Sequence, residues 1–296
     1  MSQTLITFLI IILIYVFILL VLFFKHLSGK TEKIECKALD NQKGAKNNIS
    51  SNLKVMTINL AHGRSDGRSQ ILQNKDKIKI NLDKAAEVIK KYSPDLVSLQ
   101  EADAPSVWSG NFNHVEYLAK KSGYPFFVQG EHVKGMKLAY GTAIISKIPL
   151  YEAESITFDI QPPMFTKGFI ASSIKLKDAT VEIVSLHLDF ARKSVRKKQA
   201  QKIINQFKNR TNSLIVMGDF NNEIISKDSA IKLIANELKL HTFEPYNKSL
   251  ITFPFTNKRL DWILISEKLD FVTYKVLPDI ISDHLCVLSE IKFKNM

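Results

Sequence analysis

Cysteine is nearly absent from this chain. Its 296 residues include only Cys36, in a polar segment, and Cys286, in an apolar run near the C-terminus. Two isolated cysteines cannot build a disulfide framework, and they lack the paired spacing of a zinc finger. The cysteine content therefore gives no evidence for an oxidising compartment.

Acidic residues are few compared with basic ones. The chain has 29 Asp and Glu residues against 41 Lys and Arg residues, which gives a formal net charge of +12. Such an excess favours polyanions or anionic headgroups as partners, but a lysine-rich solvated surface explains it equally well. The densest basic run, residues 192–198, begins a predicted helix over residues 191–208 whose apolar residues recur at four-residue spacing. Those charges fit either a solvent-facing helix surface or a phosphate-binding one.

Charge is missing altogether from residues 4–24, which are dominated by Leu, Ile, Val and Phe. As a helix this run is long enough to cross a hydrocarbon core of about 30 Å, so we predict a single transmembrane helix after a short flank, residues 1–3. The run is longer than the usual apolar region of a signal peptide, and no small-residue cleavage site follows it. An uncleaved anchor is therefore favoured over a cleaved signal.

Basic residues are missing before the apolar run and present after it, at Lys25, Lys30 and Lys33. The positive-inside tendency places the rest of a single-pass membrane protein on the cytoplasmic side. Large domains can be exported regardless of this bias, so the opposite orientation stays open.

Large apolar residues are rare between residues 25 and 52, where Lys, Asn, Ser and Gly dominate and nothing repeats at a helical or strand period. We predict a flexible tether over residues 25–52. No further shift in composition and no internal repeat follows. We therefore predict one large catalytic domain over residues 53–296.

Within that domain, short apolar runs alternate with longer amphipathic ones. The runs predict strands over residues 53–58, 96–99, 141–146, 169–176, 181–186, 214–217, 260–265 and 284–292, and helices over residues 82–92, 191–208 and 227–239. Pro94 is expected to end the first helix. Strands and helices mixed in this way predict a layered α/β domain, with two packed β-sheets and helices outside.

Polar and charged residues follow or begin several of these strands. They are Asn59, Glu101, His187, Asp219, Asn221, Asp261, Asp283 and His284. One acid at a strand end is more often a helix cap or a turn former, and one histidine is usually a partly buried structural residue. So many beside apolar strands indicate a reaction centre instead.

The same residues belong to recognisable motifs: TIN (57–59), PDLVSLQE (94–101), YGTAIISKIPL (140–150), SLHL (185–188), GDFN (218–221), RLDW (259–262) and SDH (282–284). Together they make residues 53–294 resemble the endonuclease/exonuclease/phosphatase family. The resemblance implies a four-layered α/β sandwich, in which two packed mixed sheets are flanked by helices. It also implies a divalent metal, usually Mg²⁺ with Mn²⁺ as an alternative, and cleavage of a phosphoester by in-line attack of water.

The resemblance implies metal binding by Glu101, with help from Asn59, while Asp283 joins or occupies a second metal site. A hard cation held by carboxylates suits this chemistry, because it neutralises the charge that repels a nucleophile. Asp219 would orient or deprotonate the attacking water. Asn221 would donate a hydrogen bond to a phosphoryl oxygen without adding negative charge.

Two histidines complete the implied catalytic set. His284 would contact the phosphate or move a proton, with its imidazole held by Asp261, because a carboxylate partner raises the pKa of a histidine and fixes its tautomer. His187 would donate to a phosphate oxygen or to the leaving group. For Asp261, an alternative is a buried ion pair with Arg259.

Three residues are candidates for binding substrate: His62, Arg64 and Tyr140. The first two follow the first metal position closely in sequence. A turn signalled by Gly63 and Gly67 accounts for them as well.

Three functions stay open. The first is a membrane-tethered hydrolase acting on a lipid headgroup, a small molecule or another phosphoester near the membrane; no protein partner is inferred. The second is a nuclease that uses the positive charge to hold DNA or RNA, although the basic and aromatic insertions of abasic-site nucleases are not evident. For the first function, Asp189, two residues after His187, departs from the pattern of sphingomyelinases. The third, a catalytically inactive binding module, is disfavoured because every expected catalytic position is filled by a competent residue.

Overall fold

The computed structural model describes residue 10 and residues 12–17, 29–39, 45, 52–67, 73–135, 137–176 and 179–294. No helix in these ranges is long and apolar enough to span a membrane. The predicted transmembrane run, residues 4–24, lies mostly outside them. So do most of residues 40–51 of the predicted tether.

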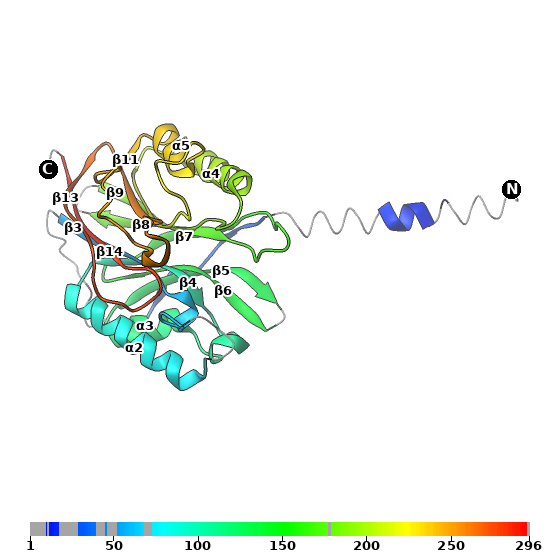
Figure 1. Cartoon of the computed structure of the whole chain (residues 1–296), viewed down its shortest axis with the longest axis horizontal. Coiled ribbons are helices and arrows are strands. Elements are labelled where there is room, and N and C mark those ends of the chain that lie inside the picture. Colours follow the sequence, from blue (N-terminus) through cyan, green and yellow to red (C-terminus); the bar gives the residue numbers. More distant parts are fainter. Residues whose placement is uncertain are drawn as a thin grey trace, which may run out of the picture.

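Two seven-stranded β-sheets pack face to face at the centre of the domain (Figure 1). The first sheet has the order β1 (Thr31–Lys33), β7 (Tyr151–Thr157), β8 (Gly168–Leu176), β9 (Ala179–His187), β10 (Ser213–Asp219), β12 (Asp261–Ser266) and β11 (Leu240–Thr242). The second has the order β13 (Leu269–Val276), β14 (Val287–Phe293), β3 (Asn52–Asn59), β4 (Leu96–Asp103), β6 (Leu138–Ser146), β5 (Phe126–Gly135) and β2 (Lys37–Ala38). Both sheets are mixed, because β9 runs parallel to β10 and β3 to β4 whereas the other pairs are antiparallel.

Helices cover the outer face of each sheet (Figure 1). The second sheet is covered by α2 (Lys75–Tyr92) and α3 (His114–Ser122), and the first by α4 (Lys193–Phe207) and α5 (Ala230–Glu237). Three short 3₁₀ turns, η1 (Ala61–Gly63), η2 (Val107–Ser109) and η3 (Pro254–Thr256), lie in loops. One apolar core fills the space between the sheets and one lies under each helix pair. The predicted α/β sandwich is confirmed.

Both faces of the central strands are buried, and this explains why their sequences read as continuous apolar runs. All seven residues of β10 are buried, since one face meets the second sheet and the other meets α4 and α5. In α4, the face shared by Val195, Ile203 and Phe207 is buried as predicted. The exposed lysines of this helix therefore belong to its solvent side.

Helix α2 begins seven residues earlier than predicted and ends where predicted. Asn74 caps its start by accepting a hydrogen bond from the Lys77 amide (2.8 Å). The first two turns are charged, so their periodicity is weak. At the other end Ser93 adopts a left-handed conformation directly before Pro94.

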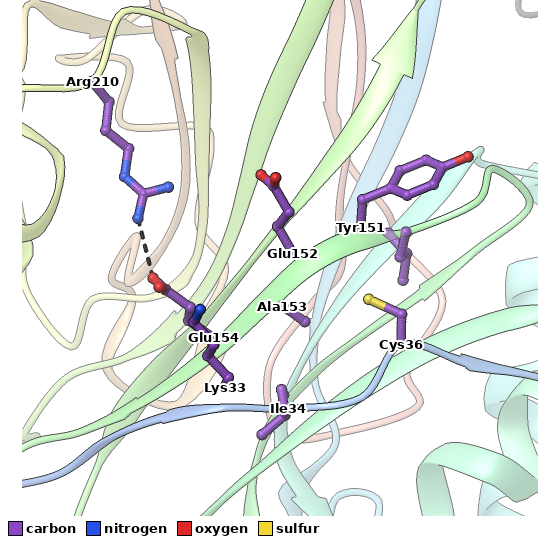
Figure 2. A pocket seen from close by; sticks show the side chains of 9 residues that line it. Lys33, Ile34, Cys36, Tyr151, Glu152, Ala153, Glu154 and Arg210 are labelled. Atoms are coloured by element: carbon purple, nitrogen blue, oxygen red, sulfur yellow. Dashed lines mark hydrogen bonds and ion pairs between the residues drawn. The ribbon is translucent and has the colours of Figure 1, made fainter.

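Residues 29–39 differ from the predicted tether. β1 pairs with β7 at the edge of the first sheet, and β2 pairs with β5 at the edge of the second. Ile34 and Cys36 lie in the segment that joins β1 to β2, near Ala153 (Figure 2). The three residues line a hollow of about 510 Å³. Edge strands are held by main-chain hydrogen bonds on one side and leave their side chains in water, so a polar sequence can form them. Composition alone missed them for that reason.

Candidate active site

The ends of several strands meet at one edge of the sandwich. The pairing of β9 with β10 places His187 beside Asp219, and the pairing of β10 with β12 places Asp219 opposite Asp261. In the second sheet, β3 ends at Asn59 next to the part of β4 that carries Glu101. Asn59 Nδ2 donates a hydrogen bond across the sheets to Asp219 Oδ2 (3.1 Å).

Asp219 is the centre of the polar cluster. Its Oδ1 accepts a hydrogen bond from the Asn221 amide (2.8 Å), and its Oδ2 accepts one from the Asn221 side chain (3.1 Å) as well as that from Asn59. The Nε2 atoms of His187 and His284 lie 3.4 and 3.9 Å from the same Oδ2. The carboxylate is almost fully buried and fixed from four sides.

His284 is oriented by Asp261, as the family resemblance implied. Its Nδ1 donates to Asp261 Oδ2 (2.8 Å), and the ring of Phe253 packs against the imidazole with centroids 4.7 Å apart. This hydrogen bond orients the ring so that Nε2 points toward Asp219. The alternative partner of Asp261, Arg259, does not pair with it. The Arg259 guanidinium stacks on Trp262, 3.8 Å from the ring centroid, and donates to main-chain carbonyls.

Lys167 lies in the site, although the sequence did not single it out. Its Nζ donates to His187 Nδ1 (3.3 Å) and lies 3.8 Å from Glu101 Oε1. Its place in the site follows from the strand pairing, because the next residue, Gly168, is the register partner of His187. The sequence alone does not contain this pairing. Lys167 thus connects the two parts of the site.

Glu101 forms the second part of the site with two of the residues predicted to bind substrate. Its Oε2 lies 3.4 Å from His62 Nε2 and 3.5 Å from Arg64 Nη1. Arg64 Nη2 also donates to Asp283 Oδ2 (2.8 Å). The guanidinium therefore bridges Glu101 and Asp283, two residues predicted to bind metal.

An aromatic wall borders this second part. His62 is held by Asp103, which accepts a hydrogen bond from its Nδ1 (2.8 Å), and its ring packs edge-on against Tyr140 with centroids 4.7 Å apart. Tyr140 stacks on Trp108 (5.3 Å), and Phe165 packs edge-on against both. Asp103 is a second residue that the sequence analysis missed.

Three residues of the site adopt left-handed backbone conformations, which residues other than glycine rarely take. They are His62 (φ 54°), Glu101 (φ 48°) and Asn221 (φ 46°). Such conformations cost free energy and persist where the surroundings enforce them, often at functional sites. Their position among the polar residues supports a functional reading of the cluster.

The model of the Endonuclease/Exonuclease/phosphatase family matches residues 56–284, more than half of the chain. The chain belongs to this family. Its members are hydrolases that act on phosphoesters and depend on a divalent metal. A comparison with curated proteins gives no match.

Solved structures share the fold at low sequence identity. A family member from Leptotrichia buccalis is 18% identical, with 81% of this chain and 100% of that chain covered and a TM-score of 0.62. A family member from Bacteroides vulgatus is 16% identical, with 82% and 99% covered and a TM-score of 0.64. The catalytic domain of human Nocturnin with a bound sulfate anion is 19% identical, with 83% and 96% covered and a TM-score of 0.62. At this identity the similarity shows the fold alone.

Burial and neighbouring charges set the protonation of the centre of this family site. Burial raises the pKa of Asp219 to about 7, although the charge of His284 opposes the rise. Burial alone would lower the pKa of His284, but Asp261 and Asp219 raise it to about 10. At neutral pH His284 is therefore a cation that can donate from Nε2, and Asp219 can exchange a proton.

In the second part of the site the pKa shifts have the opposite directions: the carboxyl pKa is lowered and the histidine pKa is lowered rather than raised. Burial alone would raise the pKa of Glu101, but the charges of His62 and Lys167 hold it far below its usual value. Burial also lowers the pKa of His187 well below its usual range, and Lys167 adds to that effect. Glu101 therefore stays ionised and His187 neutral.

One group of residues in the family site is compact enough to hold a divalent metal. A ligand atom from each of Asp219, Asp261 and His284 lies within 4.8 Å of the others, and all three residues are buried. The two carboxylates suit Mg²⁺ or Mn²⁺. The imidazole could join them only after losing the proton that Asp261 and Asp219 keep on it.

The predicted ligands have a different arrangement. Glu101 and Asp283 are joined by Arg64, and the side-chain oxygen of Asn59, Oδ1, accepts a hydrogen bond from the Ala61 amide (3.0 Å). A cation between Glu101 and Asp283 would have to share these carboxylates with the guanidinium. The site thus offers two anionic places, of which one contains an arginine.

Proposed function

We propose that this protein is a divalent-metal-dependent hydrolase of phosphoester bonds that acts by in-line attack of water. The observation that carries this proposal is the setting of Asp219. Its carboxylate is held by Asn59 and Asn221 and lies between His187 and His284. A buried carboxylate with a raised pKa beside a cationic histidine is suited to take a proton from water while the phosphate is held nearby.

The roles of the residues follow from their contacts and charges. Asp219 would orient and deprotonate the attacking water. His284, kept protonated by Asp261, would donate a hydrogen bond to a phosphoryl oxygen, where negative charge develops. Asn221 would donate to the same group after releasing one of its hydrogen bonds to Asp219. His187 is neutral and held by Lys167, so it would be a hydrogen-bond partner rather than an acid.

A bound metal would supply charge stabilisation at the phosphate. The residues that would hold it are Glu101 and Asp283, after displacement of Arg64, because Asp219 and His284 are needed for the proton transfer and the hydrogen bond described above.

We further propose that the substrate is met at a membrane. The charge-free run of residues 4–24 would anchor the chain, with the domain of residues 53–296 on the cytoplasmic side. Anchoring raises the effective concentration of an enzyme at that surface. A lipid headgroup or another phosphoester near the membrane is then the favoured substrate.

A nuclease is the second candidate, and the net charge of +12 is the observation that favours it. Salt separates the two candidates. Binding of nucleic acid should weaken steeply as ionic strength rises, because phosphate contacts release counterions. Hydrolysis of a small headgroup should depend less on salt.

The test is an activity screen of the full chain in detergent, with Mg²⁺ or with EDTA. The substrates are bis-p-nitrophenyl phosphate, mixed micelles of phospholipid and detergent, plasmid DNA and RNA. We expect Mg²⁺-dependent release from at least one substrate, and a loss of about 10³-fold or more in Asp219→Ala and His284→Ala. The control is Asp270→Ala in β13, whose carboxylate pairs with Lys294 (3.5 Å) near the end of the strand remote from the site. Full activity of Asp219→Ala would contradict the proposal.

A further inference from the structure

Large apolar side chains are exposed on the loops that surround the candidate active site. Five loops at this edge of the sandwich carry one or more, among them Val107, Phe165, Phe190, Ile225 and Phe255, with exposed fractions from 51% to 85%. We call these five residues the apolar rim. Each loop also carries or adjoins a residue of the site, as with Phe165 and Lys167 or Phe190 and His187.

The opposite edge of the sandwich has a different surface. The described turns there, at residues 93–95, 123–125, 147–150, 208–212 and 267–268, carry no exposed large apolar side chain, but Tyr151 (41% exposed) follows one of them and Ile280 (66%) lies next to Asp279, which pairs with Lys91 at the end of α2. Chance scatter of apolar residues over a soluble surface would not favour one edge. Side chains that gather around one site mark a contact surface.

Exposed lysines accompany the apolar rim. Lys137 lies against the Val107 loop, because its carbonyl accepts a hydrogen bond from the Val107 amide (2.9 Å). Others on the rim loops or at the start of the helix that follows are Lys193, Lys227, Lys248 and Lys258. Apolar tips beside cationic side chains are the combination that binds an anionic bilayer surface.

The chain also enters the domain at this edge. The Gly29 amide donates to Asp159 Oδ1 (2.7 Å), and the Lys30 carbonyl accepts from the Thr157 amide (2.8 Å). Thr157 pairs with Gly168, and Gly168 pairs with His187 of the site. In Figure 1 the chain leaves the domain on the side where the loop between β7 and β8 lies.

We propose that the apolar rim docks on the bilayer, so that the candidate active site faces the lipid surface. This inference rests on the proposed membrane anchor of residues 4–24. The five steps from residue 24 to residue 29 span at most about 18 Å. Since β1 fixes residues 31–33 to the domain, so short a connection holds the site edge near the membrane.

The docked arrangement specifies the substrate class more closely than anchoring alone. A phosphoester group at the level of the lipid headgroups would enter the site directly, between loops whose tips lie in the interface. A long duplex would have to pass between the rim and the membrane. The docked rim therefore favours a phospholipid-like or lipid-linked phosphoester over nucleic acid.

The depth of single labelled positions in the membrane tests this proposal. The full chain with Cys36→Ser is reconstituted into vesicles of phosphatidylcholine and phosphatidylglycerol, carrying a fluorophore on either Phe255→Cys or Lys268→Cys. Phe255 is on the rim, whereas Lys268 is exposed in the turn at the opposite edge. Quenching by doxyl-labelled lipid should be about threefold or more stronger at position 255 than at position 268.

Equal quenching at the two positions, stronger quenching at position 268 or no quenching at either would overturn the proposal. Hydrolysis of bis-p-nitrophenyl phosphate by the same labelled proteins is measured in parallel. Because that substrate is soluble, its hydrolysis reports on the proposed chemistry without the membrane. A failure of docking is thereby distinguished from a failure of the proposed function.

Discussion

At the scale of single residues, the centre of the site is a carboxylate whose ionised form is costly to keep. Asp219 is buried, and Asp261 adds a second negative charge nearby, while His284 and three hydrogen bonds offset only part of that cost. A group selected for stability alone would be neutral here. Function and folding stability therefore oppose each other at this position.

Asp219→Asn should separate these two properties. The pKa of Asp219 is raised to about 7, so its contribution to stability is present at low pH and is lost as pH rises toward 7. In EDTA at pH 8 we expect the variant to have a free energy of unfolding about 2 kcal/mol higher than the natural protein, together with almost no activity. Below about pH 4 the two proteins should be equally stable. Urea unfolding at the two pH values measures the difference, and a less stable variant at pH 8 would contradict this account.

Arg64 acts on the other half of the site. Its guanidinium bridges Glu101 and Asp283, so a metal at these carboxylates has to compete with a fixed positive charge. Arg64→Met should raise the affinity for Mn²⁺ about tenfold, measured by calorimetry. The matched control is Arg210→Met, whose guanidinium pairs with Glu154 and Glu182 at the opposite edge. Unchanged affinity in Arg64→Met would contradict metal binding at Glu101 and Asp283.

At the scale of elements, the N-terminal strands connect the two sheets along one side of the sandwich. β1 extends the first sheet and β2 the second, and Ile34 and Cys36 pack between them against the central core. One short polar segment thus supplies the edge strand of both sheets. It also fixes where the chain enters the domain.

Ile34→Asp tests the role of this segment. Placing a charge against the core should lower the free energy of unfolding by about 2 kcal/mol. Glu32→Ala, in β1 and exposed, should leave it nearly unchanged. Chemical unfolding of the full chain in detergent provides the measurement. If both variants behave like the natural protein, residues 29–39 act as a tether after all.

At the scale of the whole molecule, one edge of the sandwich combines three features. It carries the candidate active site, the apolar rim and the point where the chain enters the domain. Strands from distant parts of the sequence end at this one edge of the sandwich, so the loops that follow them can build one surface there. If the apolar rim docks on the bilayer, it would fix the orientation of the domain so that this edge faces the lipid.

Much of the site could be predicted because each residue stands beside a buried strand with a readable apolar sequence. Asn59, Glu101, His187, Asp219, Asp261 and His284 were found in this way, and the structure places them at one edge. Lys167 and Asp103 could not be found, because a lone lysine before a strand and an acid within one have no local signal. Their partners, His187 and His62, lie 20 and 41 positions away in the chain.

The sequence by itself determined the family, the layered α/β class and the residue types of the reaction centre, because apolar periodicity and short motifs are local properties. Only the tertiary structure decided that Arg64 bridges Glu101 and Asp283 and that Lys167 connects Glu101 to His187. It likewise decided that residues 31–33 and 37–38 are strands and that the apolar rim lies on loops beside the site. These features depend on strand pairing and sheet packing between distant segments, and no window of sequence contains that information.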